Sequence, residues 1–185
     1  MADSFLGDGL ILDEMRPLAW LPGPLAQGGE LANLNADNLQ LLIAEASIEE
    51  TRATEALKEE SPAVLHELQR LEYKLNILLR LTAELTMRQN AMPKIYRMRL
   101  SAQGLEWSLG GPTAGASGLL QLYINASMPQ PLLLPCIVEH EVHRDSQRVS
   151  QLRFAGLSEP MIDALDKLIF RHHRRLIASS RQSPG

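Results

Sequence analysis

Residues 61–90 read SPAVLHELQRLEYKLNILLRLTAELTMRQN, and this stretch decides how the chain is organised. Ser61 is a good helix N-cap, and Pro62 suits the first helical position, where its missing N–H costs nothing. The apolar residues that follow fit heptad position a at Leu68, Leu75, Thr82 and Gln89, and position d at Val64, Leu71, Leu78 and Leu85. About four heptads in register predict a coiled coil. A core helix of a globular domain is the alternative.

The apolar seam of this helix is wide. Leu65, Leu79 and Leu81 add apolar residues at positions e and g. A seam that spreads into e and g is too wide for a dimer and suits a tetramer or a helix with extra partners. We therefore predict a homotetramer whose helices meet at Val64, Leu68, Leu71, Leu75, Leu78, Leu79, Thr82 and Leu85. The pattern leaves parallel and antiparallel packing open.

Composition indicates a cytoplasmic protein without a membrane span. Of 185 residues, 45% are apolar, but no uninterrupted apolar run approaches the length of a membrane span. The first residues, MADSFLGDGL, lack the basic segment of a signal peptide, and the lone Cys136 suits a reducing compartment. We expect Cys136 to be a small buried hydrophobe.

Charge is distributed unevenly along the chain. Residues 1–92 hold 15 acidic and 7 basic side chains, whereas residues 93–185 hold 7 acidic and 11 basic ones, within a net charge of -4. The overall balance argues against a nucleic-acid binder. The basic second half leaves room for a small anionic ligand or an acidic protein partner.

The order of predicted elements places two helices among strands. Residues 10–21 form a candidate strand, which Pro17 restricts to an edge or a bulge. A helix follows from about Asn35 or Asp37 to Glu60, then the heptad helix. From Lys94 the pattern alternates, with candidate strands around 97–109, 118–127, 132–144 and 146–157, and a helix capped by Ser158. Several short strands separated by Gly and Pro turns indicate an antiparallel barrel or sandwich.

One group of residues suggests phosphate binding. Arg97, Arg99, Ser101 and Gly104 lie at the start of the alternating region. A serine with a glycine three residues later can present a hydroxyl and backbone N–H groups to a phosphate, and arginine supplies fork-shaped donors. An ordinary turn with surface arginines is the alternative.

A metal site at residues 136–143 is disfavoured. Strict strand alternation puts His140 with Cys136 on one face, and His143 with Glu139 and Glu141 on the other. Zinc needs convergent ligands, so we predict no metal site. No nucleophile elbow, P-loop or dinucleotide fingerprint is present either, and we predict a protein that is not an enzyme.

Four motifs follow one another in the second half: S-x-x-G-L-x-W at 101–107, G-L-L-Q-L-Y-I at 118–124, L-L-L-P-C-I-V-E-H-E-V at 132–142 and F-A-G-L at 154–157. Through these motifs the chain resembles, from about residue 94 to 178, a PilZ domain, the bacterial barrel that receives cyclic di-GMP. The resemblance implies a six-stranded antiparallel barrel with a C-terminal helix. The predicted fold is thus α+β, a PilZ-type barrel interrupted by two long helices that form an oligomeric coiled coil.

The chain departs from the family's ligand motifs. Ser101 and Gly104 match D/N-x-S-x-x-G, but Arg99 holds the first position. The family's R-x-x-x-R should fall near residues 1–9, which contain no arginine. Charge-assisted hydrogen bonds of this kind contribute roughly 1.5–3 kcal/mol each, so we expect weak or no cyclic di-GMP binding and no other cofactor.

The resemblance implies a signalling or adaptor protein in cyclic di-GMP-linked control of motility, biofilm or virulence, acting through protein partners. The alternative is a direct receptor that uses Arg97, Arg99, Ser101 and Gly104, joined by Arg16 if the first strand lies beside them. The predicted domains are a first-strand segment (1–35), an inserted helical hairpin (36–92), the remaining barrel with its helix (93–178) and a flexible tail (179–185).

Overall fold

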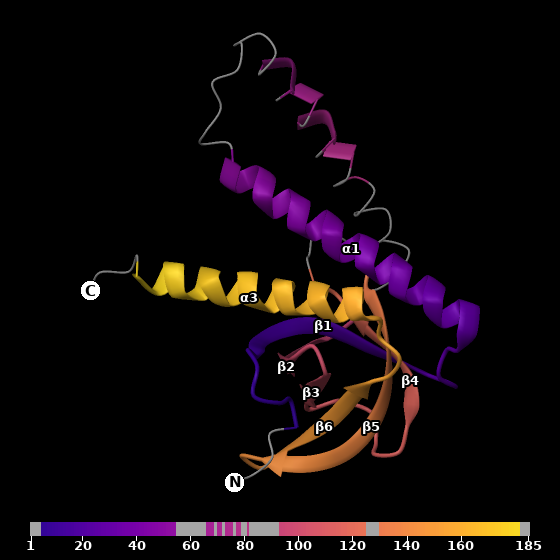
Figure 1. Ribbon diagram of the computed structural model, residues 1–185. Helices are drawn as coiled ribbons and strands as arrows, with labels where there is room; N and C mark the ends of the chain where they lie inside the picture. Colours follow the sequence, from indigo (N-terminus) through magenta and orange to yellow (C-terminus); the bar gives the residue numbers. More distant parts are fainter. Residues whose placement is uncertain are drawn as a thin grey trace.

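The strands form a closed antiparallel barrel in the computed structural model (Figure 1). The structure describes residues 5–54, 66–68, 70–71, 73–75, 77–78, 81, 93–124 and 130–181. The strands are β1 (Leu12–Pro22), β2 (Ile95–Leu100), β3 (Gly104–Ser108), β4 (Ser117–Leu122), β5 (Leu132–Arg144) and β6 (Gln147–Phe154). Around the barrel their order is β1-β2-β3-β6-β5-β4, and the helices are α1 (Gly28–Thr54) and α3 (Glu159–Arg181).

Strand β1 closes the barrel by pairing with two neighbours in turn. Its residues up to Pro17 pair with β2, and those from Leu18 onward pair with β4. Pro17 therefore lies where the strand changes partner, and its carbonyl still accepts a hydrogen bond from Tyr123 N at 3.3 Å. The expectation that Pro17 confines this strand to an edge or a bulge is wrong, because a closed barrel has no edge.

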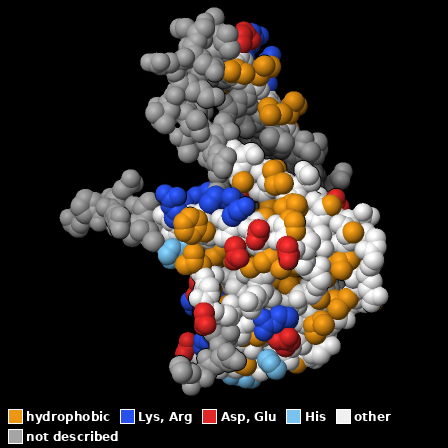
Figure 2. Space-filling model, viewed as in Figure 1, with side chains coloured by type: hydrophobic (Ala, Val, Ile, Leu, Met, Phe, Trp, Pro, Cys, Tyr) orange, Lys and Arg blue, Asp and Glu red, His pale blue; other side chains and the backbone are white. Residues whose placement is uncertain are grey.

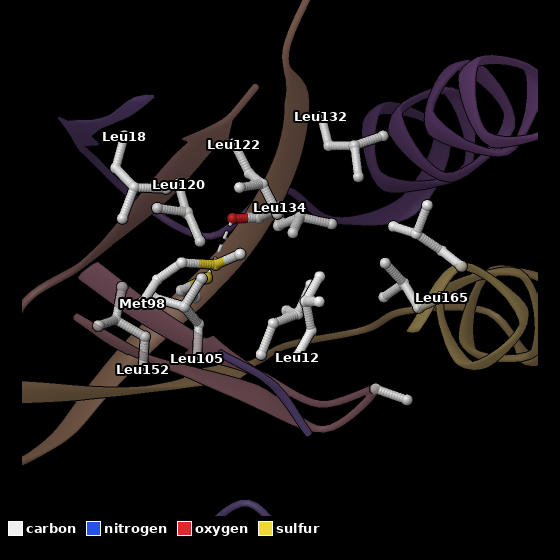
Figure 3. Packing of buried hydrophobic residues seen from close by; sticks show 14 of the residues in the cluster. Leu12, Leu18, Met98, Leu105, Leu120, Leu122, Leu132, Leu134, Leu152 and Leu165 are labelled. Atoms are coloured by element: carbon white, nitrogen blue, oxygen red, sulfur yellow. Dashed lines mark hydrogen bonds between the residues drawn. The ribbon is translucent and has the colours of Figure 1, made fainter. Parts of the chain in front are cut away.

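The hydrophobic core fills the barrel and continues under α3. Leucines from every part of the barrel wall, among them Leu12, Leu105, Leu120, Leu134 and Leu152, point into one cluster (Figure 3). Leu165 enters the same cluster from α3, beside Met161, Leu168 and Ile169. Cys136 is fully buried within this core, and burial raises the pKa of its thiol far above the ordinary value. The expectation of a small buried hydrophobe is confirmed.

Helix α1 is held to the barrel by two asparagine side chains. Asn38 Nδ2 donates to Leu133 O at 2.8 Å, while its Oδ1 accepts from Leu133 N at 2.9 Å. Asn35 Nδ2 donates to Gly156 O at 3.0 Å, and its Oδ1 accepts from Ser158 N at 3.1 Å. The helix begins at Gly28, so the predicted start at Asn35 or Asp37 is wrong. Asn35 is an interior residue that clamps α1 to the loop before α3.

Helix α3 lies over the barrel beside β1 and is in contact with α1 (Figure 1). It follows Ser158, whose carbonyl accepts from Met161 N and Ile162 N at 3.0 Å, as its predicted place at the helix start requires. The helix continues to Arg181, past the start of the predicted tail at 179, and residues 182–185 lie outside the described part. Within the described residues, no helix is both long and apolar enough to cross a membrane.

The heptad stretch is helical wherever the structure describes it, at residues between 66 and 81. Its apolar side chains face solvent in the single chain: Leu68 is 50% exposed, Leu71 60%, Leu75 57% and Leu78 61%. The other predicted contact residues, Val64, Leu79, Thr82 and Leu85, lie outside the described residues. The association of these helices and the domain boundaries stay predictions.

Candidate functional site

The Ser101 hydroxyl accepts a hydrogen bond within the turn between β2 and β3. Ser101 N donates to Gly104 O at 3.0 Å, and Ser101 Oγ accepts from Gln103 N at 3.2 Å. Ser101 is only 4% exposed. The S-x-x-G pair therefore builds a tight, buried turn, which is the ordinary structural role of these residue types.

The N-terminal segment lies against this turn. A Cβ added to Gly104 would lie 2.5 Å from Leu152 O and 3.3 Å from the Phe5 ring, so only glycine fits there. Arg153 lies 4.3 Å above the Phe5 ring centroid, and its Nη1 donates to Phe5 O at 3.1 Å. Phe5 thus places an aromatic ring beside the Ser101–Gly104 turn.

Arg97 is paired with a carboxylate of the neighbouring strand. Its Nε and Nη2 donate to the two oxygens of Asp13, both at 3.0 Å. The hydrogen bond to Asp13 and its negative charge raise the pKa of the Arg97 guanidinium. This pair is exposed on the outer face of the barrel, where an ion pair contributes little to stability.

Arg99 belongs to a second, more buried cluster centred on Glu106. Arg99 Nη1 donates to Glu106 Oε2 at 2.8 Å. Arg144 contributes two further bonds, from Nη1 to Oε2 at 2.8 Å and from Nη2 to Oε1 at 3.1 Å. Gln151 Nε2 donates to Oε1 at 3.0 Å. We call Arg99, Glu106, Arg144 and Gln151 the Glu106 cluster.

The Glu106 carboxylate stays ionised in this environment. Burial alone would raise its pKa, but hydrogen bonds from Arg144 and Gln151, together with the charges of Arg144 and Arg99, bring the pKa below the ordinary value of 4.5. The Glu106 bond in turn raises the pKa of Arg144. The cluster is therefore a set of ion pairs held on the outer barrel face, next to the Ser101–Gly104 turn.

Arg16 does not join the other arginines. It pairs with Tyr96 on β2, three residues from the register position of Arg99, and donates to Glu14 and to the carbonyl of Ile124. Glu14 also lies 3.3 Å from His172 Nδ1 on α3. The hydrogen bond from His172 is the main cause that lowers the pKa of Glu14. The Arg16 guanidinium is thus engaged away from Arg97 and Arg99, although β1 lies beside β2 as the receptor alternative requires.

A bulge in β5 changes the predicted positions of the histidines. The register moves from Val138 opposite Leu152 to His140 opposite Gln151, which leaves Glu139 as the extra residue. Cys136 and Val138 are buried, whereas His140 is exposed. The prediction that His140 shares a face with Cys136 is therefore wrong. Among the described residues, no group of three or more His, Cys, Asp and Glu side chains could hold a metal ion.

Sequence reasoning missed the partners that engage the arginines. Asp13, Glu106, Arg144 and Gln151 were not among the predicted site residues. One signal was present, because Glu106 lies between Leu105 and Trp107, and alternation puts it on the outer face with Arg99. No local pattern in the sequence linked Arg144 to Glu106, since Arg144 lies at the far end of β5.

Comparisons with known proteins agree with this architecture. The family model for "Atypical PilZ domain, cyclic di-GMP receptor" matches residues 42–182. A search of curated proteins found no relative. A tetrameric PilZ protein from Xanthomonas campestris, described as self-assembled via a helical bundle, has a TM-score of 0.73 and 26% identity, over 92% of this chain and 91% of that chain.

Two further solved structures match less than half of this chain. YcgR from Escherichia coli, in complex with cyclic di-GMP, has a TM-score of 0.40 and 17% identity, over 48% of this chain and 39% of that chain. The Bacillus subtilis inhibitor of motility has a TM-score of 0.37 and 15% identity, over 44% and 43%. With a closed barrel, a C-terminal helix and a family match over most of its length, the chain belongs to the atypical PilZ domain family.

Proposed function

We propose that this PilZ protein is an adaptor in cyclic di-GMP-linked regulation of motility, biofilm or virulence, with weak or no direct binding of the nucleotide. The observation that carries the proposal is that the candidate ligand groups are already engaged within the chain. Arg97 binds Asp13, Arg99 binds Glu106, and the Ser101 hydroxyl accepts a hydrogen bond inside its own turn. A ligand would have to displace these partners, which reduces its net gain in free energy.

In this proposal, several copies of the adaptor assemble, and each copy exposes its own barrel. Leu68, Leu71 and Leu75 are each at least half exposed on one helix, and burying them against other copies would remove apolar area from water. The Xanthomonas campestris relative, which aligns over nearly the whole chain, is described as a tetramer joined by a helical bundle. A tetramer would present several identical barrel faces, so that weak contacts gain avidity.

Helix α3 offers a surface that fits an acidic protein partner. Figure 2 shows Lys and Arg side chains gathered along the second half of this helix, beside hydrophobic side chains. Phe170 is 50% exposed there, with Arg174 lying 5.9 Å from its ring centroid. Exposed aromatic and arginine side chains together are typical of protein interfaces.

The second candidate function is a direct receptor that uses Arg97, Arg99, Ser101 and Gly104, and the family description favours it. Calorimetric titration with cyclic di-GMP separates the two. We expect weak or undetectable binding, unchanged in the double variant Arg97→Ala, Arg99→Ala. Micromolar or tighter binding that the double variant loses would instead establish the receptor.

A further inference from the structure

The Glu106 carboxylate lies between two arginines that approach it from different strands. Arg99 reaches it from the adjacent strand β2, and Arg144 reaches it from the end of β5, just before the turn into β6. Converging guanidinium groups are the arrangement that proteins use to grip carboxylates and phosphates. The chain therefore carries an assembled anion site, and the anion is one of its own residues.

The site is fully occupied by this internal anion. Each Glu106 oxygen accepts two hydrogen bonds: Oε2 from Arg99 and Arg144, and Oε1 from Arg144 and Gln151, at 2.8–3.1 Å. Glu106 is only 3% exposed. An incoming phosphate would meet guanidinium groups that are already neutralised, beside a carboxylate that repels it.

The exposed ion pairs elsewhere on the barrel do not have this form. Glu139 bonds a single arginine, Arg153, at 3.3–3.4 Å, and Glu141 lies 3.4 Å from Arg148. Neither carboxylate is buried. The Glu106 cluster is thus distinguished by burial and by two guanidinium groups that share one carboxylate.

We propose that Glu106 is an intramolecular competitor that keeps phosphate-bearing ligands off Arg99 and Arg144 and so determines the ligand specificity of this barrel face. This inference rests on the proposed function, because it names the residue responsible for weak nucleotide binding. Neutralising Glu106 would leave two guanidinium groups beside the Ser101–Gly104 turn, with the amide of Gln151 next to them.

The test is calorimetric titration of the full chain and its Glu106→Gln variant with cyclic di-GMP and, separately, with inorganic phosphate. We expect the variant to bind cyclic di-GMP about tenfold or more tightly than the parent, since two guanidinium donors become available to phosphate oxygens. This gain should weaken as salt is raised. A matching gain with inorganic phosphate would show that the released site recognises the phosphate group alone, and a smaller one would show that the rest of the nucleotide contributes.

Glu139→Gln is the matched control, because it removes one carboxylate from an exposed Arg–Glu pair and changes the net charge equally. It should leave both affinities unchanged. If Glu106→Gln does not fold, the double variant Glu106→Gln, Arg144→Gln removes the repulsion between the two arginines and still frees Arg99. Folded variants that bind no more tightly than the parent would overturn the inference, whereas tight binding by the parent would overturn the proposed function instead.

Discussion

At the scale of single residues, Glu106 makes the free energy of unfolding depend on pH. Its pKa lies below the ordinary value of 4.5, so the folded state favours the ionised form. Its contribution to stability is complete above the unfolded pKa and is lost as the pH falls through the lower, folded value. Breaking a buried ion-pair cluster by removing one partner costs about 3 kcal/mol or more.

We therefore expect Glu106→Gln to lower the free energy of unfolding by about 3 kcal/mol at neutral pH. The difference from the parent should shrink as the pH falls below the range in which glutamate ionises. Urea denaturation of both proteins over a pH series measures this difference in unfolding free energy. Glu139→Gln, in an exposed pair, should cost less than about 1 kcal/mol. If the difference in unfolding free energy between the parent and Glu106→Gln stayed constant at all pH values, a lowered pKa of Glu106 in the folded state would be contradicted.

The residues of the site could be predicted in part. Local alternation puts Glu106 on the opposite face from Leu105 and Trp107, and turn chemistry offered an ordinary turn at Ser101 and Gly104 as the alternative to a phosphate site. These local patterns could not pair Glu106 with Arg144, which lies 38 residues away in the chain. The β5 bulge adds one residue between Val138 and His140, so alternation counted from Cys136 fails beyond it.

At the scale of elements, α1 depends on polar contacts more than its sequence indicates. The strands and the heptad helix follow from strong alternation and from the leucine spacing. The start of α1 was placed too late because asparagine and aspartate are typical caps. Asn35 and Asn38 instead face the barrel, at positions where apolar side chains usually hold a helix in place. The apolar stripe of α1 is therefore narrow.

Asn38→Ala should loosen α1 from the barrel. The backbone N–H and carbonyl of Leu133 are both hydrogen-bonded to the Asn38 side chain, which is only 2% exposed. The change leaves both backbone groups without these partners. We expect a loss of about 2–3 kcal/mol in unfolding free energy and faster hydrogen exchange at the Leu133 amide. Asn33→Ala, on the exposed face of the same helix, should stay within about 0.5 kcal/mol of the parent. Equal effects of the two variants would mean that α1 is held by other contacts.

At the scale of the whole molecule, the barrel closes through a strand that is distant in sequence from the others. β1 precedes α1, while the remaining strands follow residue 93, and β1 pairs with both β2 and β4. The family match begins at residue 42 and does not include β1. Without β1 the barrel would have two open edges, which are prone to pairing with other chains. The chain between β1 and β2 therefore connects two strands that pair with each other in the same sheet.

This placement makes self-assembly the property of the whole molecule that is easiest to test. The parent protein should give several times the chain mass of 20.6 kDa in light scattering, with a tetramer as the expected state. Leu71→Glu with Leu78→Glu should reduce the mass to that of one chain, because unpaired charges at d positions cannot be buried in a helical bundle. Tyr73→Glu, at the outward f position and 68% exposed, should leave the assembly intact. Since the barrel core contains none of these residues, circular dichroism of the charged variant should retain its strand signal. A monomeric parent would exclude the bundle, and a double variant that stays assembled would place the contact elsewhere on the chain.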